Sequence, residues 1–93
     1  MKRRLCRLSA VDELKLPGDA HKAMRYLQLF CADQEHTDEL WAVANNAALV
    51  ALSAREGGRP AFADAQQVLQ QLSLLQIAGL ARAYQRMYEG DAR

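Results

Sequence analysis

Apolar residues recur at intervals of three and four through the first third of the chain, which is the spacing of an amphipathic helix. This stripe predicts a helix over about residues 19–34, and its members are Ala20, Ala23, Met24, Leu27, Phe30 and Cys31. A shorter helix is predicted before it, over residues 10–16, because Ser9 can cap the first turn. Pro17 and Gly18 are expected to end that short helix.

The most extended helical pattern lies over residues 38–56, where Thr37 is a suitable cap. Two neighbouring apolar rows run along it, one formed by Leu40, Val43, Ala47, Val50 and Ala54 and the other by Trp41, Ala44, Ala48, Ala51 and Leu52. Because this apolar arc is wide, we expect a central helix that is contacted on two sides. The stretch EGGRP ends it, since glycine can adopt the left-handed conformation and Pro60 cannot continue a helix.

Two complete capping signals follow in the last third of the chain. Asp64 is followed three residues later by Gln67, and Ser73 by Gln76, so each pair can satisfy backbone N–H groups at a helix start. Residues 64–88 therefore form either one helix that is kinked near Ser73 or two helices with a bend there. The bend is favoured, because a second complete cap serves no purpose inside a continuous helix. The residues expected to close the core from this segment are Leu74, Ile77 and Leu80.

The composition also favours helices. Hydrophobic residues make up 51% of the chain and many are alanine, which loses no side-chain entropy when a helix forms. The β-branched residues that strands prefer are scarce. The sequence therefore predicts an all-α fold, a small single-domain bundle of four to five helices over residues 9–90. Residues 1–8 are basic, show no periodicity and are expected to form a flexible N-terminus.

The net charge of +1 conceals an uneven distribution of charged residues, with +4 on residues 1–32 and −4 on residues 33–64. Such opposed poles suit head-to-tail contacts between molecules, although solvated charged faces are the simpler explanation. No apolar signal segment follows the basic start, and no apolar run is long enough to span a membrane. For a chain with two cysteines, these features predict a cytoplasmic location with reduced thiols.

Groups that could catalyse a reaction or bind a metal form no familiar pattern. The possible metal ligands are Cys6, His21, Cys31 and His36, and none of them stands at CxxC, HxxxH or HExxH spacing. The glycine pair in EGGRP lacks the lysine and the hydroxyl residue of a phosphate-binding loop. We therefore predict no catalytic residue, no metal site and no cofactor, and a protein that is not an enzyme.

A small helical DNA-binding regulator is the main alternative function. The basic stretch MKRRLCR can follow phosphates, and the glycine turn at residues 57–58 can belong to a helix-turn-helix. However, a recognition helix needs basic or amide side chains that reach the bases. The helix after this turn offers glutamines but no basic residue before Arg82, so a nucleic-acid partner is disfavoured. An interaction module of another bacterial complex is a third possibility.

The last predicted helix has apolar and aromatic residues on more than one face. Tyrosine combines an apolar ring with a hydroxyl group that stays hydrated, and methionine adapts to irregular surfaces, so both suit protein interfaces. Three such residues lie close to the end of this helix. The predicted partner-binding residues are Leu80, Tyr84, Met87 and Tyr88.

The order of these features resembles the small tail assembly chaperones of long-tailed bacteriophages and prophages. The stretch LSAVDEL is followed by the alanine-rich WAVANNAALVALSA, a glycine and proline break, and the closing segment VLQQLSLLQIAGLARAYQRMYEG. The closing segment contributes most, with a helix start at Leu72 and Ser73, Gln76 three residues later, and the aromatic Tyr84 near the end. The resemblance covers about residues 8–90.

This resemblance implies an all-helical, non-enzymatic protein that self-associates in the cytoplasm of the host cell. Chaperones of this family coat the long helical tape-measure protein before tail-tube subunits polymerise around it. Some are also made as a longer, frameshifted form with an added domain that recruits the tube protein. The implied partners are therefore the tape-measure protein, the tail-tube protein and further copies of the chain, and no single contact residue is assigned.

Overall fold

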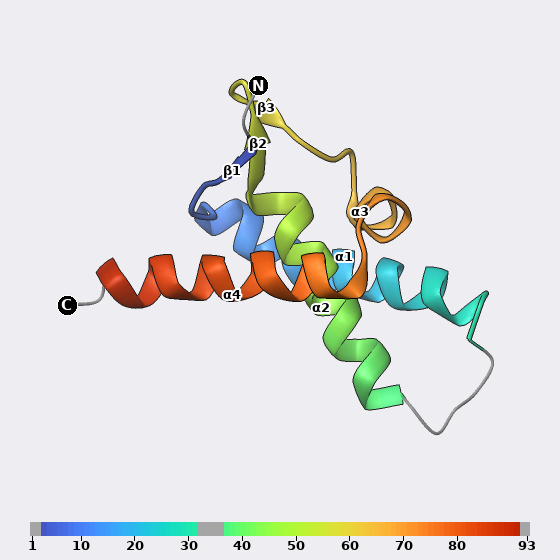
Figure 1. Ribbon diagram of the computed structural model, residues 1–93. Helices are drawn as coiled ribbons and strands as arrows, with labels where there is room; N and C mark the ends of the chain where they lie inside the picture. The colour runs from blue at the N-terminus through green and yellow to red at the C-terminus, as the bar shows by residue number, and fades with distance from the viewer. Residues whose placement is uncertain (1–2, 32–36, 92–93) are drawn as a thin grey trace.

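The structure, a computed structural model, describes residues 3–31 and 37–91, with side chains described as far as Met87. Figure 1 shows its elements, which in chain order are β1 (Arg3–Leu5), α1 (Ala10–Gln28), α2 (Thr37–Ser53), β2 (Ala54–Glu56), β3 (Arg59–Pro60), α3 (Ala65–Gln71) and α4 (Leu74–Asp91). The predicted helical fold is confirmed in its main part. A small antiparallel sheet, with the strand order β1-β2-β3, is an addition that the sequence did not predict.

α2 is the central helix, as its wide apolar arc predicts. It contacts α1, α3 and α4, and in Figure 1 α4 crosses in front of α2 while α1 lies behind it. The buried residues of α2 are mostly small, namely Ala44, Ala47, Ala48, Val50, Ala51 and Ser53. Since the distance between packed helices depends on the side chains at the contact, these alanines allow several helices to pack closely on one.

α1 is one helix where the sequence predicts two. It runs through Pro17 without ending, although a proline inside a helix removes one backbone hydrogen bond and crowds the preceding turn. Packing against the core offsets this cost, because one side of α1 lies against the core from the residue before the proline onward, through Leu16, Ala20, Ala23, Met24 and Leu27. The expected break at Pro17 and Gly18 is therefore wrong. The expected helix end near residue 34 is also wrong, because α1 ends at Gln28 and the described residues 29–31 are not part of a helix.

Replacing Pro17 with alanine is expected to raise the free energy of unfolding by about 1–2 kcal/mol, because the alanine N–H can restore the missing helix hydrogen bond. Urea denaturation followed by the fluorescence of Trp41, the single tryptophan, measures the change. Pro60→Ala is the matched control, since Pro60 lies in a strand and should show no such gain. A loss of stability in Pro17→Ala would instead indicate two helices that meet at the proline.

The residues after α2 form a β-hairpin. β2 pairs with β3 across the two-residue turn Gly57-Gly58, whose φ angles of 62° and 81° lie in the left-handed region. Glycine adopts these angles without strain, and a two-residue hairpin turn of this kind needs them at both positions. The expectation that the glycine pair ends the helix is therefore wrong, because β2 separates α2 from Gly57, and the pair instead reverses the chain into a second strand. The helix ends at Ser53, three residues before the predicted boundary at residue 56.

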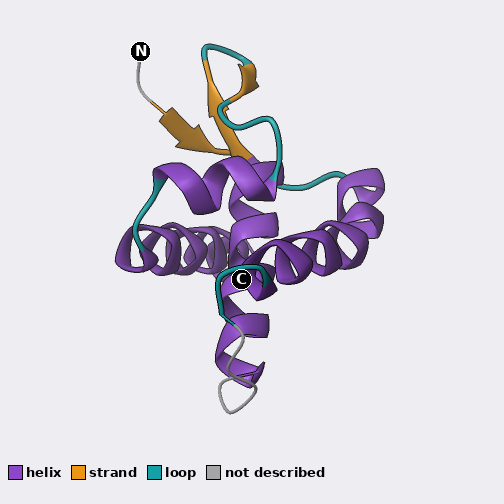
Figure 2. Cartoon of the chain, turned by 90° about the vertical axis from the view of Figure 1, so that its right-hand side faces the viewer, coloured by secondary structure: helices purple, strands orange, loops and turns teal. Residues whose placement is uncertain are grey.

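β1 adds a third strand from the basic start of the chain. Residues 1–8 are expected to be flexible, but Arg3–Leu5 instead pairs with β2, with Leu5 opposite Ala54. The hairpin offers an unpaired edge to this segment, and Leu5 packs against the core. Both views place the sheet at one end of the helical part of the molecule (Figure 1, Figure 2).

The bend before α4 is confirmed, together with both caps. Asp64 accepts a hydrogen bond of 2.9 Å from the backbone N–H of Gln67 at the start of α3. At the start of α4, the Ser73 hydroxyl accepts from the backbone N–H of Gln76 at 3.2 Å, and the Gln76 side chain accepts from the backbone N–H of Ser73 at 2.8 Å. Two capped helix starts this close together, the second of them reciprocal, prevent one continuous helix.

Candidate protein-interaction surface

The residues predicted to bind a partner lie along α4. Leu80 packs against the core, and Met87 is half-buried. Tyr84 is also half-buried, and its hydroxyl accepts a hydrogen bond of 3.2 Å from the backbone N–H of Leu8, which ties α4 to the segment before α1. The side chain of Tyr88 lies outside the described residues. A partner-binding role for these four residues stays a prediction.

The strongly exposed apolar side chains of the described residues lie elsewhere. They are Val11 (61% exposed), Leu14 (82%), Leu29 (77%), Phe30 (71%), Leu74 (65%) and Leu75 (82%). The expectation that Leu74 closes the core is therefore wrong, whereas Ile77 is buried as predicted. Leu74 is the first residue of α4, one turn before Ile77, so it projects beyond the part of the helix that meets the core.

Sequence reasoning missed the exposed leucines of α1, although a signal for them was present. Leu14 and Leu29 fall on the side of α1 opposite the buried stripe, so a helical projection places them in solvent. The apolar stripe identifies the buried side of the helix. It gives no information about apolar residues on the opposite side. Leucines on the opposite side are the feature that points to a partner.

The C-terminal end of α1 is held in place by α3. The side-chain amide of Gln70 donates a hydrogen bond of 3.0 Å to the hydroxyl of Tyr26. The ring of Phe30 meets the ring of Tyr26 edge to face, with the two centroids 5.1 Å apart. The exposed ring of Phe30 is therefore positioned by fixed neighbours.

The sheet has a basic character. Arg4 and Arg55 are directly opposite each other on neighbouring strands, and like charges in such a pair repel. The guanidinium of Arg3 lies 4.7 Å from the centroid of the Phe62 ring, a cation–π contact. No ion pair within the described part of the chain neutralises Arg4 or Arg55. These two side chains are available to an anionic partner.

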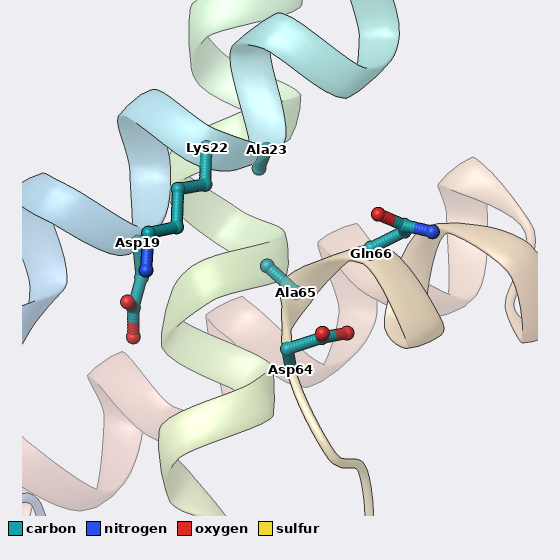
Figure 3. A pocket seen from close by; sticks show the side chains of 6 residues that line it. All are labelled: Asp19, Lys22, Ala23, Asp64, Ala65 and Gln66. Carbon is teal, nitrogen blue, oxygen red and sulfur yellow. The ribbon is translucent and has the colours of Figure 1, made fainter.

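A shallow depression lies between α1 and the start of α3. Figure 3 shows its lining residues, Asp19, Lys22, Ala23, Asp64, Ala65 and Gln66, with Lys22 running beside Asp19. Its volume of about 160 Å³ is smaller than the roughly 300 Å³ at which ligand pockets begin. The carboxylate of Asp64 is already engaged in the cap of α3. This depression therefore does not resemble a site for a substrate.

The candidate metal ligands are not brought together among residues 3–31 and 37–87. No group of three His, Cys, Asp or Glu side chains that could hold an ion occurs there. His21 meets Trp41 edge to face at 5.0 Å, and both described thiols, Cys6 and Cys31, are free. His36 lies outside the described residues. In the same part of the chain, no helix is long and apolar enough to cross a membrane.

Comparisons of the chain with protein-family models, with curated proteins and with solved structures find no match. The resemblance of residues 8–90 to tail assembly chaperones therefore has the sequence pattern as its sole support. The exposed apolar side chains of α1 and α4 are an independent feature on which a functional proposal can build.

Proposed function

We propose that this protein is a non-enzymatic chaperone that covers helical segments of a partner during assembly, and specifically a tail assembly chaperone of a long-tailed phage or prophage. The exposure of six large apolar side chains among the described residues of so small a domain supports the proposal. The core is largely alanine, and a small domain has little apolar surface to leave in water. Leucines that are exposed instead of buried in the core therefore indicate a surface that another chain covers.

The tape-measure protein of a phage tail is a suitable partner. It presents long amphipathic helix, whose apolar stripe has to be shielded until the tail-tube protein closes around it. A small helical domain with exposed leucines can cover a short length of that stripe, and many copies can cover all of it. Because each contact is small, the tube protein can displace the copies one after another.

The opposed charges support self-association along such a ligand. Asp38 and Glu39 lie in the first turn of α2, whereas Arg55 follows directly after its last turn and lies beside Arg4 in the sheet. The acidic and basic poles therefore lie at opposite ends of one helix (Figure 1). Copies that line up head to tail would bring unlike poles together.

Co-expression with the tape-measure protein from the same genome tests this function. The tape-measure protein is expected to be insoluble alone, and to become soluble and co-purify when this protein is present. A Leu14→Ser, Leu75→Ser variant should lose much of the captured protein, while Ala42→Ser, an exposed position of α2, should retain it. A tape-measure protein that stays soluble without this chain would contradict the proposal.

DNA binding is the second candidate function, and Arg4 and Arg55 are the residues that favour it. Two unpaired guanidinium groups on one small sheet can contact phosphates. If this function is correct, a labelled DNA duplex should bind with an affinity that falls steeply as salt rises, and Arg4→Glu should weaken binding. The chaperone proposal expects no such binding at physiological salt.

A further inference from the structure

The exposed positions of α1 include one continuous face. Starting from Val11 they recur at intervals of three and four, which is one side of a helix with 3.6 residues per turn. The residues that define this outer face of α1 are Val11, Leu14, Gly18, Lys22, Arg25 and Leu29. The buried residues of α1, Ala20, Ala23 and Met24, belong to the opposite side. The outer face therefore runs the length of the helix without being covered by the other described elements.

The charge on this face has a single sign. Lys22 and Arg25 lie on it, and Lys15 falls in the same series of exposed positions. The acidic residues of α1 are outside that series: Asp12 and Asp19 are half-buried, and Glu13 is exposed but two positions after Val11 and so on another side of the helix. Figure 3 shows that Asp19 lies at the border of the face, beside Lys22. The outer face of α1 thus combines apolar and basic side chains. A complementary partner would offer apolar groups to the first and acidic groups to the second.

Gly18 lies in the middle of this face. A Cβ atom added there would meet no atom within 4 Å, so the glycine is not required by packing inside the domain. A glycine in a helix interior costs about 1 kcal/mol relative to alanine. Its presence lets another backbone approach α1 closely, between Leu14 and Leu29.

We propose that the outer face of α1 binds an amphipathic helix of a partner protein, with an apolar stripe flanked by acidic residues. Val11 lies in α1 and Leu29 is the C-cap of this helix, 18 positions later and still in helical backbone conformation. This separation corresponds to about 27 Å and matches a helix of about five turns. The leucines receive the apolar stripe, the three basic side chains pair with its carboxylates, and Gly18 sets the close approach. This inference rests on the proposed function, and it specifies the chemistry of the segment that is bound.

The distribution of residues favours a helix over the other anionic partners. A membrane-binding helix places its basic residues on the polar side and its apolar residues on the other, whereas here both occur on the same side. DNA offers phosphates to Lys15, Lys22 and Arg25. Its phosphates would leave Leu14 and Leu29, which are 82% and 77% exposed, without an apolar partner. An acidic amphipathic helix satisfies both kinds of side chain at once.

The direct test measures binding of a labelled synthetic helix by fluorescence anisotropy. The probe is a peptide of about 21 residues in which leucine and alanine form one stripe and glutamate flanks it, and the reference peptide has lysine in place of glutamate. The glutamate peptide is expected to bind at least about tenfold more tightly than the lysine peptide. The double variant Lys22→Glu, Arg25→Glu should reverse this order. Equal affinity for both peptides would overturn the proposal.

Gly18→Leu is the decisive variant, because it fills the face without disturbing the fold. It should bind the glutamate peptide at least about tenfold more weakly, while its thermal stability is unchanged or higher. Gly79→Leu is the matched control, since Gly79 is an exposed glycine of α4 where an added Cβ also meets nothing within 4 Å. Wild-type binding in Gly18→Leu, or an equal loss in Gly79→Leu, would place the binding site elsewhere.

Two further probes separate the competing partners. Vesicles of phosphatidylglycerol and a short DNA duplex should each bind without dependence on Gly18, or not bind at all. Binding of either probe that is lost in Gly18→Leu would assign the face to that partner and overturn the proposal. If the tape-measure protein is captured equally by wild type and Gly18→Leu, the proposed function stands and this docking face is wrong. If it is not captured at all while the glutamate peptide binds, the proposed function fails and the docking face stands.

Discussion

Replacing Phe62 with alanine is expected to lower the free energy of unfolding by about 3–5 kcal/mol, which is a large part of the stability of a small domain. Phe62 is 2% exposed and is the largest of the fully buried side chains. In the chain it lies between β3 and α3. Most of the other buried residues of the core are alanines. Small neighbours cannot collapse into the space that a lost ring leaves, so the cavity persists and its cost adds to the lost burial.

Urea denaturation of the Phe62→Ala variant measures this loss, again through the fluorescence of Trp41. Phe30→Ala provides the control, because its ring is 71% exposed and its removal should change stability by no more than about 0.5 kcal/mol. Trp41 is half-buried, so its own replacement should cost less than that of Phe62. A loss below about 1 kcal/mol in Phe62→Ala would mean that the segment between the sheet and α3 is not part of the core.

The second large effect is expected when Ala47 is replaced by leucine, with a loss of stability near the upper end of about 1–3 kcal/mol. Ala47 is 0% exposed in α2, the helix on which α1, α3 and α4 all pack. A leucine at this position has no free volume to enter, so it has to push a neighbouring helix away. The buried alanines of α2 are therefore required for the close packing of its neighbouring helices, in addition to favouring helix formation.

Ala42→Leu is the matched control for this experiment, because Ala42 is an exposed residue of the same helix. It should change stability by at most about 0.5 kcal/mol, since the helix propensity of the two residues is similar. Thermal denaturation of the two variants side by side separates an effect of packing from an effect on helix formation. Equal behaviour of Ala42→Leu and Ala47→Leu would show that α2 is not tightly packed.

The sequence pattern did not identify much of the candidate surface. The partner-binding prediction selected Tyr84 and Met87 by residue type, whereas the structure exposes Leu14 and Leu75 most strongly. Tyr84 is held by its hydrogen bond to the backbone of Leu8, 76 positions away in the sequence. Whether an apolar residue is covered depends on which segments lie beside its helix, and that is a non-local property.

The sequence by itself determined the local features of this protein, because short-range interactions decide them. The caps at Asp64 and Ser73 satisfy nearby backbone groups, and they specify the bend before α4 wherever that bend lies in the molecule. The glycines at positions 57 and 58 likewise form the turn between β2 and β3 through their own backbone freedom. The wide apolar arc of α2 indicated a central helix for the same reason, since periodicity is a property of one segment.

Only the tertiary structure decided the continuity of α1 and the third strand. Pro17 is tolerated because α1 packs against α2 and the core from Leu16 onward, and Arg3–Leu5 becomes a strand because a hairpin more than 45 positions later offers an edge. In each case a contact between distant segments outweighs a local preference of about 1–3 kcal/mol. Such contacts form only when the chain has folded, so local sequence rules alone cannot predict them.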